Sequence, residues 1–129
     1  MTTDLICLLI LALWTLPLNH IPAIGRASKA GLDWAMSNRD RQPEVPEWVG
    51  RADRAQRNHL DNLAMIASVI LIAQITGKAD GTTAIASIVL LLARIAHSLT
   101  YLAGLPLPRS LSYFVSIAAL LTIVWRLFA

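Results

Sequence analysis

The chain has 129 residues, of which 56% are hydrophobic and only 15% charged, and its mean hydropathy is +0.58. A soluble domain carries about 25% charged residues, so this composition excludes an ordinary soluble protein. The net charge of +3 does not indicate nucleic-acid binding, because the basic residues are scattered between apolar stretches rather than gathered on one module. We therefore expect no nucleic-acid partner, and the length allows a single domain over residues 1–129.

Four stretches are long and apolar enough to approach the roughly 20 residues needed to cross a bilayer. With their flanking residues they predict helices at about 3–24, 49–76, 82–103 and 108–128, with a polar loop over about 25–48. No alternating runs with turn residues at strand spacing are present, so strands are not expected. The predicted fold class is all-α, an integral membrane bundle of four transmembrane helices.

The distribution of basic residues predicts the orientation in the membrane. The first connection holds six of them: Arg26, Lys29, Arg39, Arg41, Arg51 and Arg54. The second connection holds only Lys78, next to Asp80. Because short loops rich in Lys and Arg stay in the cytoplasm, we expect both termini on the non-cytoplasmic side. The single cysteine, Cys7, cannot form a disulfide within the chain, which argues against four-helix thiol oxidases.

Polar residues gather at the predicted cytoplasmic end of the bundle. Counting outward from the turn near Ala79 places Asp61 of the second helix opposite His97 of the third, with Arg94 about one turn deeper. A buried guanidinium needs a partner, and Asp61 is the only acidic residue deep enough. We therefore predict an ion pair between Arg94 and Asp61, which on its own can be purely structural.

That pair leaves other arginines without enough acid nearby, namely Arg51, Arg54, Arg57 and Arg109. Arginine presents a planar fork that suits carboxylates and phosphates. Attraction to anionic lipid headgroups would explain such a cluster. However, neutral donors at defined positions favour a specific anion site; these are Asn58, Tyr101, Ser110 and Tyr113. His97 is a candidate hydrogen-bonding residue, and no metal site is expected because no second His or Cys lies at ligand spacing.

Three motifs in this region resemble one known family. They are Arg54-Ala-Gln-Arg-Asn58-x-x-Asp61-Asn, Ala93-Arg-Ile-Ala-His97-Ser-Leu-Thr-Tyr101-Leu and Pro-Arg109-Ser110-Leu-Ser-Tyr113, and Asn38-Arg-Asp40 precedes them. Together they resemble the MAPEG family (membrane-associated proteins in eicosanoid and glutathione metabolism). The chain is similar to a small bacterial member near the microsomal prostaglandin E synthase and microsomal glutathione transferase branch. The resemblance covers about residues 37–128.

The resemblance implies a homotrimer that binds glutathione, as cosubstrate, between neighbouring subunits at the cytoplasmic end. By the same resemblance Arg109 stabilises the thiolate and Ser110 supplies a hydroxyl for that role. Seven further positions match residues that line the glutathione site: Arg54, Arg57, Asn58, Asp61, His97, Tyr101 and Tyr113. The acidic position is usually Glu, so Asp61 is one methylene shorter than the family pattern.

Three functions follow from these observations. The first is a glutathione-dependent transferase or peroxidase in a bacterial inner membrane, which acts on a lipophilic electrophile from the bilayer. The second is a non-enzymatic membrane protein that uses the same pocket for an anionic metabolite or lipid. The third is a small drug-efflux transporter, but that type needs a carboxylate near the middle of its first helix, where this chain has only Asp4 at the outer end.

Overall fold

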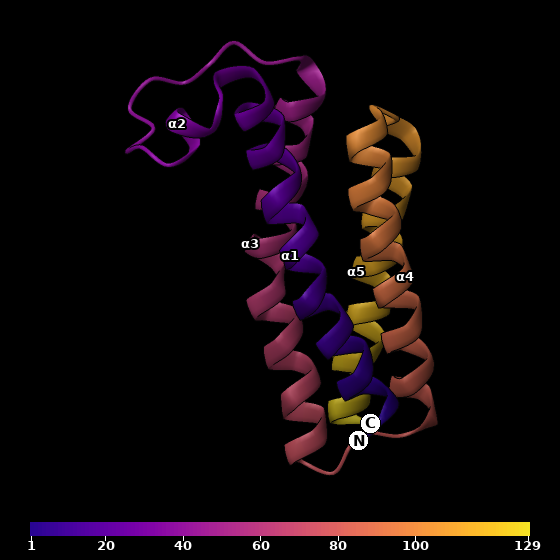
Figure 1. The fold of residues 1–129 in the computed structure, drawn as a ribbon. Helices are drawn as coiled ribbons and strands as arrows, with labels where there is room; N and C mark the ends of the chain where they lie inside the picture. The colour runs from indigo at the N-terminus through magenta and orange to yellow at the C-terminus, as the bar shows by residue number, and fades with distance from the viewer.

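The structure is a computed structural model that describes all 129 residues, and it is entirely helical. Its elements are α1 (Thr3–Ala30), α2 (Leu32–Ala35), α3 (Glu47–Ile75), α4 (Gly81–Ala103) and α5 (Pro106–Phe128). All but α2 are long and apolar enough to cross a membrane (Figure 1). The predicted all-α class with four membrane-spanning helices is therefore confirmed.

The first helix is longer than the sequence analysis predicted. It continues past residue 24 to Ala30, even though Pro17 and Pro22 lie inside it. It ends where Gly31 adopts a φ of 89° and donates its backbone N–H to the Ala27 carbonyl at 2.8 Å. The irregular part of the predicted loop is correspondingly shorter, and it contains the single-turn helix α2.

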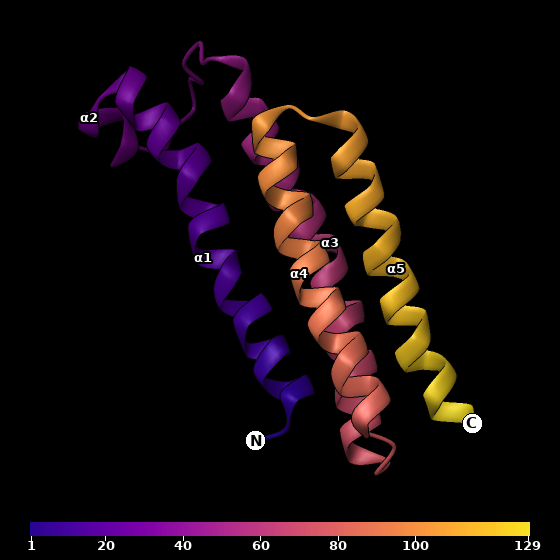
Figure 2. The ribbon, with the colours of Figure 1, turned by 90° about the vertical axis from the view of Figure 1, so that its right-hand side faces the viewer.

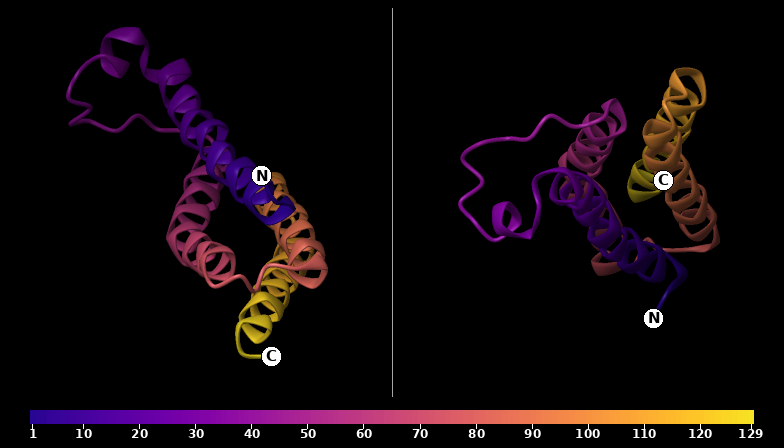
Figure 3. Two further views of the ribbon diagram at one scale, coloured as in Figure 1. Left: turned by 90° about the horizontal axis from the view of Figure 1, so that it is seen from below. Right: turned by 45° about the horizontal axis from the view of Figure 1, so that its top comes forward.

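The bundle has two distinct ends. Both termini and the α3–α4 turn lie at one end, which we call the terminus end, and α2 and the α4–α5 turn lie at the other, which we call the loop end (Figures 1 and 2). α1 crosses the bundle obliquely between them (Figure 3). At the terminus end Ser87 of α4 donates to Asp4 of α1 at 2.9 Å, whereas at the loop end Arg26 of α1 is bonded to Asp53 of α3.

The hydrophobic core is small and lies mostly towards the terminus end. It is formed by 11 buried residues: Cys7, Leu11, Ile66, Ile70, Ala73, Ala86, Leu90, Leu91, Ala119, Leu120 and Ile123. Only 26 of the 129 residues are buried, and many large apolar side chains point outward from all four long helices. Such an apolar exterior suits a bilayer or neighbouring subunits rather than water.

The chain reverses direction at both ends of α4, and side-chain caps and backbone conformation fix where the helices begin and end there. Asp80 caps its N-terminus, accepting the backbone N–H groups of Thr82 and Thr83, and Thr83 completes a capping box. At the other end Gly104 adopts the left-handed conformation with a φ of 74°. Pro106 occupies the first turn of α5, where its fixed φ favours helix initiation. Residues on either side of this turn are thereby held close together at the loop end.

Candidate functional site

Six of the predicted site residues line one cavity of about 280 Å³ at the loop end. They come from α3, α4 and α5, and the full lining is Asn58, His97, Tyr101, Arg109, Ser110, Tyr113 and Phe114. The α4–α5 reversal brings them together, because the residues before Gly104 and after Pro106 face one another across the turn. We call this cavity the thiol pocket, after the ligand that the sequence analysis predicted for it.

Tyr101 lies between two guanidinium groups. The guanidinium carbon of Arg109 is 4.8 Å from the centre of its ring, and that of Arg54 is 5.9 Å away. A cation over an aromatic face is attracted by about 0.5–1 kcal/mol at exposed sites. Tyr101 therefore helps to hold two positive charges near one another without neutralising either.

His97 connects the wall of the thiol pocket to the start of α5. Its Nδ1 is 3.0 Å from the Arg109 carbonyl oxygen, so this nitrogen carries the proton and donates it. Its ring also makes an edge contact with Tyr101 at 5.6 Å and a tilted contact with Tyr113 at 5.9 Å. The residue is only 4% exposed, and its Nε2 has no hydrogen-bond partner. The backbone that carries Arg109 is thus tied to a buried aromatic cluster.

The predicted ion pair between Arg94 and Asp61 is not formed. Arg94 donates instead to Asn58, to its side-chain oxygen at 2.8 Å and to its carbonyl oxygen at 3.2 Å. Asp61 is exposed and makes no salt bridge. Counting residues from the turn gave the depth of Asp61 but not its direction, and Asp61 shares the outward face of α3 with Arg57, one turn away. Asn58, three residues earlier, is the one that faces α4.

Arg94 is consequently a buried cation with an incomplete set of partners. It is 1% exposed, and its Nε and Nη1 atoms have no hydrogen-bond partner. A charged side chain within the membrane costs about 3 kcal/mol by insertion scales, so it is normally paired or functional. Its position behind Asn58, a wall of the thiol pocket, makes Arg94 part of the electrostatic environment of that pocket.

Positive charge at the loop end exceeds the negative charge available to pair with it. Of the three salt bridges in the structure, one joins Arg26 to Asp53 and a second joins Arg51 to Glu47 at a long 3.9 Å. The third lies at the terminus end. No carboxylate lies within 4 Å of the other six arginines at this end, which are Arg39, Arg41, Arg54, Arg57, Arg94 and Arg109. The site is suited to an anionic ligand.

Residues 5–129, essentially the whole chain, match the MAPEG family. The chain belongs to the MAPEG family. Neither a curated protein nor a solved structure matches it. The resemblance noted from the three motifs is thus confirmed at the level of the family.

Three of the predicted site residues lie outside the thiol pocket of this MAPEG protein. Arg57 and Asp61 are exposed on the outward face of α3, and neither lines the thiol pocket or the cavity beside it. Arg54 lies in a second, adjacent cavity together with Arg51. The sequence analysis counted Arg51 among the arginines without acid but did not place it in the site. Phe114 was missed altogether, and only its spacing of four residues from Ser110 could have indicated that it faces the same cavity.

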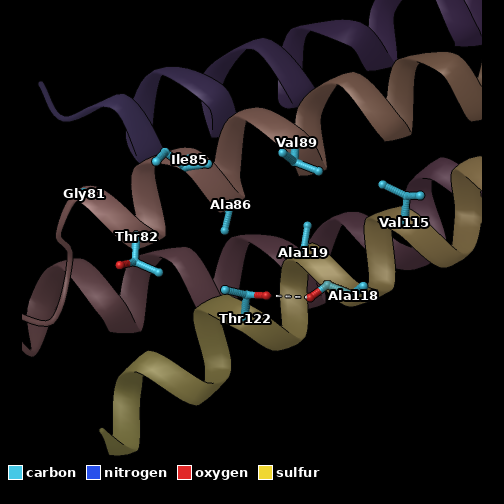
Figure 4. Close-up of a pocket in the computed structure, with 9 residues that line it drawn as sticks. All are labelled: Gly81, Thr82, Ile85, Ala86, Val89, Val115, Ala118, Ala119 and Thr122. Carbon is cyan, nitrogen blue, oxygen red and sulfur yellow. Dashed lines mark hydrogen bonds between the residues drawn. The ribbon is translucent and has the colours of Figure 1, made fainter.

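The largest cavity of this MAPEG protein is remote from the arginines of the loop end. It is an apolar groove of about 660 Å³ between α4 and α5 near the terminus end, with Ile85, Val89 and Val115 among its walls (Figure 4). Its one hydrogen bond in that view joins the Thr122 hydroxyl to the Ala118 carbonyl of the same helix at 2.9 Å. No charged side chain lines the groove, and its only hydroxyl side chains are Thr82 and Thr122, so the charged candidate site residues all lie elsewhere.

Proposed function

We propose that the protein is a membrane-bound, glutathione-dependent transferase or peroxidase that activates glutathione as a thiolate in the thiol pocket. The observation that carries this proposal is the grouping of Arg109, Ser110 and His97 around one cavity, next to arginines that no carboxylate neutralises. Glutathione carries two carboxylates and a thiol, and it complements such a pocket. Membership of the MAPEG family, which includes glutathione transferases, supports the same assignment.

Arg109 is the residue that activates the thiol. A free thiol has a pKa of about 8.5, so most of it is protonated at neutral pH. Lowering that pKa by one unit requires about 1.4 kcal/mol of stabilisation of the thiolate, which a partly buried cation can supply. Ser110 donates its hydroxyl proton to the Pro106 carbonyl at 3.0 Å, so it must rotate to donate to the sulfur. We assign Ser110 a hydrogen-bonding role that is secondary to the charge of Arg109.

The activated sulfur would react with a lipophilic substrate that reaches the pocket from the bilayer. In a transfer reaction the thiolate attacks an electrophilic carbon, a C–S bond forms, and the displaced electron pair leaves with the leaving group or is protonated on an opened ring. In peroxide reduction the thiolate attacks the O–O bond, which yields an alcohol and a glutathione sulfenic acid. A second glutathione then converts the sulfenic acid to the disulfide and water.

We further propose that three copies of the chain form a homotrimer around α3. Arg57 and Asp61 are exposed on an outward face of this helix, close to the apolar part that crosses the membrane. Lone charges on a lipid-facing surface are costly, whereas charges on a subunit interface find partners. In the trimer the glutathione-binding residues would include Arg54, Arg57, Asn58, Asp61, His97, Tyr101 and Tyr113. The orientation inferred from the basic loop places this end in the cytoplasm of a bacterium, with the protein in the inner membrane and both termini outside.

Ultraviolet difference absorbance tests the proposal directly. The protein purified in detergent is titrated with glutathione near neutral pH, and we expect a thiolate absorbance band that Arg109→Ala abolishes. Arg41→Ala is the matched control, because it removes the same charge from an exposed loop position at the same end. A band of equal size in Arg109→Ala would exclude the assigned role of Arg109. The absence of a band in the intact wild-type assembly would exclude thiol activation.

The second candidate is a non-enzymatic protein that binds an anionic metabolite or lipid. The cavity that contains Arg51 and Arg54 favours this second function. Arginines line it, and of the two residues assigned to thiol activation it contains only Arg109, which also lines the thiol pocket. This function predicts saturable binding of glutathione or another anion without consumption of thiol when electrophiles or hydroperoxides are added. Turnover in the wild type that is lost in Arg109→Ala would decide for the enzyme.

A further inference from the structure

A second, smaller cavity of about 180 Å³ adjoins the thiol pocket on the other side of Tyr101 and Arg109. We call it the arginine pocket. Its lining includes Arg51, Arg54, Arg109, Tyr101, Gly104 and Leu105. It is smaller than the thiol pocket, so it suits a single chemical group rather than a whole molecule.

The arginine pocket is strongly positive. Three guanidinium groups line it and no acidic residue does. The nearest carboxylate is that of Glu47, 3.9 Å from Arg51, on a side chain that is 97% exposed. An exposed pair of this kind is screened by water and contributes little, so it leaves the positive charge of the pocket largely uncompensated.

Arg51 is held in place by the end of α4. Its Nε donates to the Leu102 carbonyl at 3.0 Å, and its guanidinium packs against Gly104. A Cβ at position 104 would lie 3.3 Å from the Arg51 Cζ and Nε atoms, so the glycine makes room for the arginine. Only one of the five guanidinium donors is used in a hydrogen bond within the protein, so the remaining donors are free for a ligand.

The rim of the arginine pocket is apolar. Leu105 lies in the α4–α5 turn and lines the pocket, and Leu107 follows it in the first turn of α5; their exposed fractions are 49% and 68%. Apolar side chains next to a basic cluster suit the boundary between headgroups and acyl chains of a membrane. The leucines would contact acyl chains while the arginines reach the headgroup layer.

We propose that the arginine pocket binds a phosphate group. Phosphate oxygens accept paired hydrogen bonds from guanidinium forks, and several arginines around one small cavity match this pattern. Two sources share this chemistry, the headgroup of an anionic phospholipid and free inorganic phosphate. The exposed leucines of the rim favour the lipid.

The two cavities share Arg109 and Tyr101, so a bound phosphate acts on the thiol pocket. A negative charge beside Arg109 offsets part of the positive charge that stabilises the thiolate. Anionic lipid would then lower the fraction of glutathione that is ionised. This regulatory consequence rests on the proposed function, whereas phosphate binding itself does not.

Native mass spectrometry of the intact assembly in an uncharged detergent tests the binding. Phosphatidylglycerol or phosphatidylcholine is added, and the lipids retained are counted. We expect selective retention of phosphatidylglycerol, and about a tenfold loss of affinity in Arg51→Gln, since a hydrogen bond to a charged group is worth about 1.5–3 kcal/mol. Arg54→Gln should show the same loss, and it removes no hydrogen bond within the protein. Arg41→Gln, at the same end but outside both cavities, should bind like the wild type.

The second arm distinguishes the two sources of phosphate. Phosphorus NMR line widths of inorganic phosphate are measured with the lipid-free protein and with the same variants. Loss of lipid retention in Leu105→Ser and Leu107→Ser, with unchanged phosphate broadening, would assign the site to a lipid headgroup. Broadening that depends on Arg51 without any lipid retention would assign it to free phosphate.

Equal behaviour of Arg51→Gln, Arg54→Gln and Arg41→Gln in both arms would overturn the proposal. The thiolate band measured without lipid is independent of this result. A failure of phosphate binding is therefore distinguishable from a failure of the proposed function.

Discussion

The two ends of the bundle use their charged residues in opposite ways. At the terminus end, Arg126 pairs with Asp80, Lys78 donates to the Ala129 carbonyl, and Ser87 donates to Asp4. At the loop end, six arginines have no carboxylate within salt-bridge distance. Charges at the terminus end thus fasten the chain to itself, whereas many at the loop end remain available to a ligand or a neighbouring subunit. The comparison therefore distinguishes an end whose charged groups are paired from an end where most of the arginines have no carboxylate partner.

Replacing Arg94 should have the largest effect on ligand binding, and it tests most directly whether the two ends of the bundle differ. Arg94→Met keeps an unbranched, though shorter, side chain and removes the buried charge, so the cost of burying a cation disappears. We expect glutathione affinity to fall by about tenfold or more, while the melting temperature in detergent stays near that of the wild type. Isothermal titration and thermal unfolding measure the two effects.

Leu90→Met serves as the control for Arg94→Met, because it places the same side chain at another buried position of α4. A large fall in melting temperature with unchanged glutathione affinity would make Arg94 a structural residue. The loop end would then resemble the terminus end.

Replacing Ser87 tests whether the contacts at the terminus end are purely structural. Ser87→Ala removes the hydroxyl that donates to the buried Asp4, and the carboxylate keeps no other hydrogen bond from a side chain. Loss of a hydrogen bond to a buried charged group destabilises by about 1.5–3 kcal/mol, so we expect a clear fall in unfolding free energy. Glutathione affinity and the thiolate band should not change, because the residue is far along α4 from the thiol pocket. A change in thiolate formation would show that the two ends are coupled.

Asp80 gives the smallest expected effect and makes the terminus end sensitive to acid. The hydrogen bond from Arg126 lowers the pKa of the Asp80 carboxyl below its usual value, and the N–H groups of Thr83 and Thr82 act in the same direction. The stabilisation is therefore fully present above the ordinary pKa of about 3.9 and is lost as the pH falls through the lower folded-state value.

The measurement compares melting temperatures of wild type and Asp80→Asn between pH 6 and pH 3. Asparagine still caps α4 but cannot titrate, so the variant should lose fewer degrees on acidification than the wild type, with a difference on the order of a few degrees. Identical pH profiles would mean that the Asp80–Arg126 pair contributes nothing to stability.

The sequence by itself determined the class of protein and the approximate position of its site. Long apolar stretches form helices in a membrane, because in lipid the backbone N–H and C=O groups must form hydrogen bonds with one another. Residue counting from the α3–α4 turn predicted that Asn58, His97 and Tyr101 gather at one end of the bundle, and the structure places all three around one cavity there. The end of α1 was predicted too early, because the helix continues through Gly25 and stops only at Gly31, where the backbone turns to a positive φ.

The tertiary structure alone decided which side chains face one another. Depth along a helix follows from a rise of about 1.5 Å per residue, but the direction of a side chain depends on how each helix is rotated against its neighbours. For this reason Asn58 rather than Asp61 meets Arg94. The same rotation, together with the left-handed turn at Gly104, places Arg51 over the end of α4 and divides the arginines between two cavities.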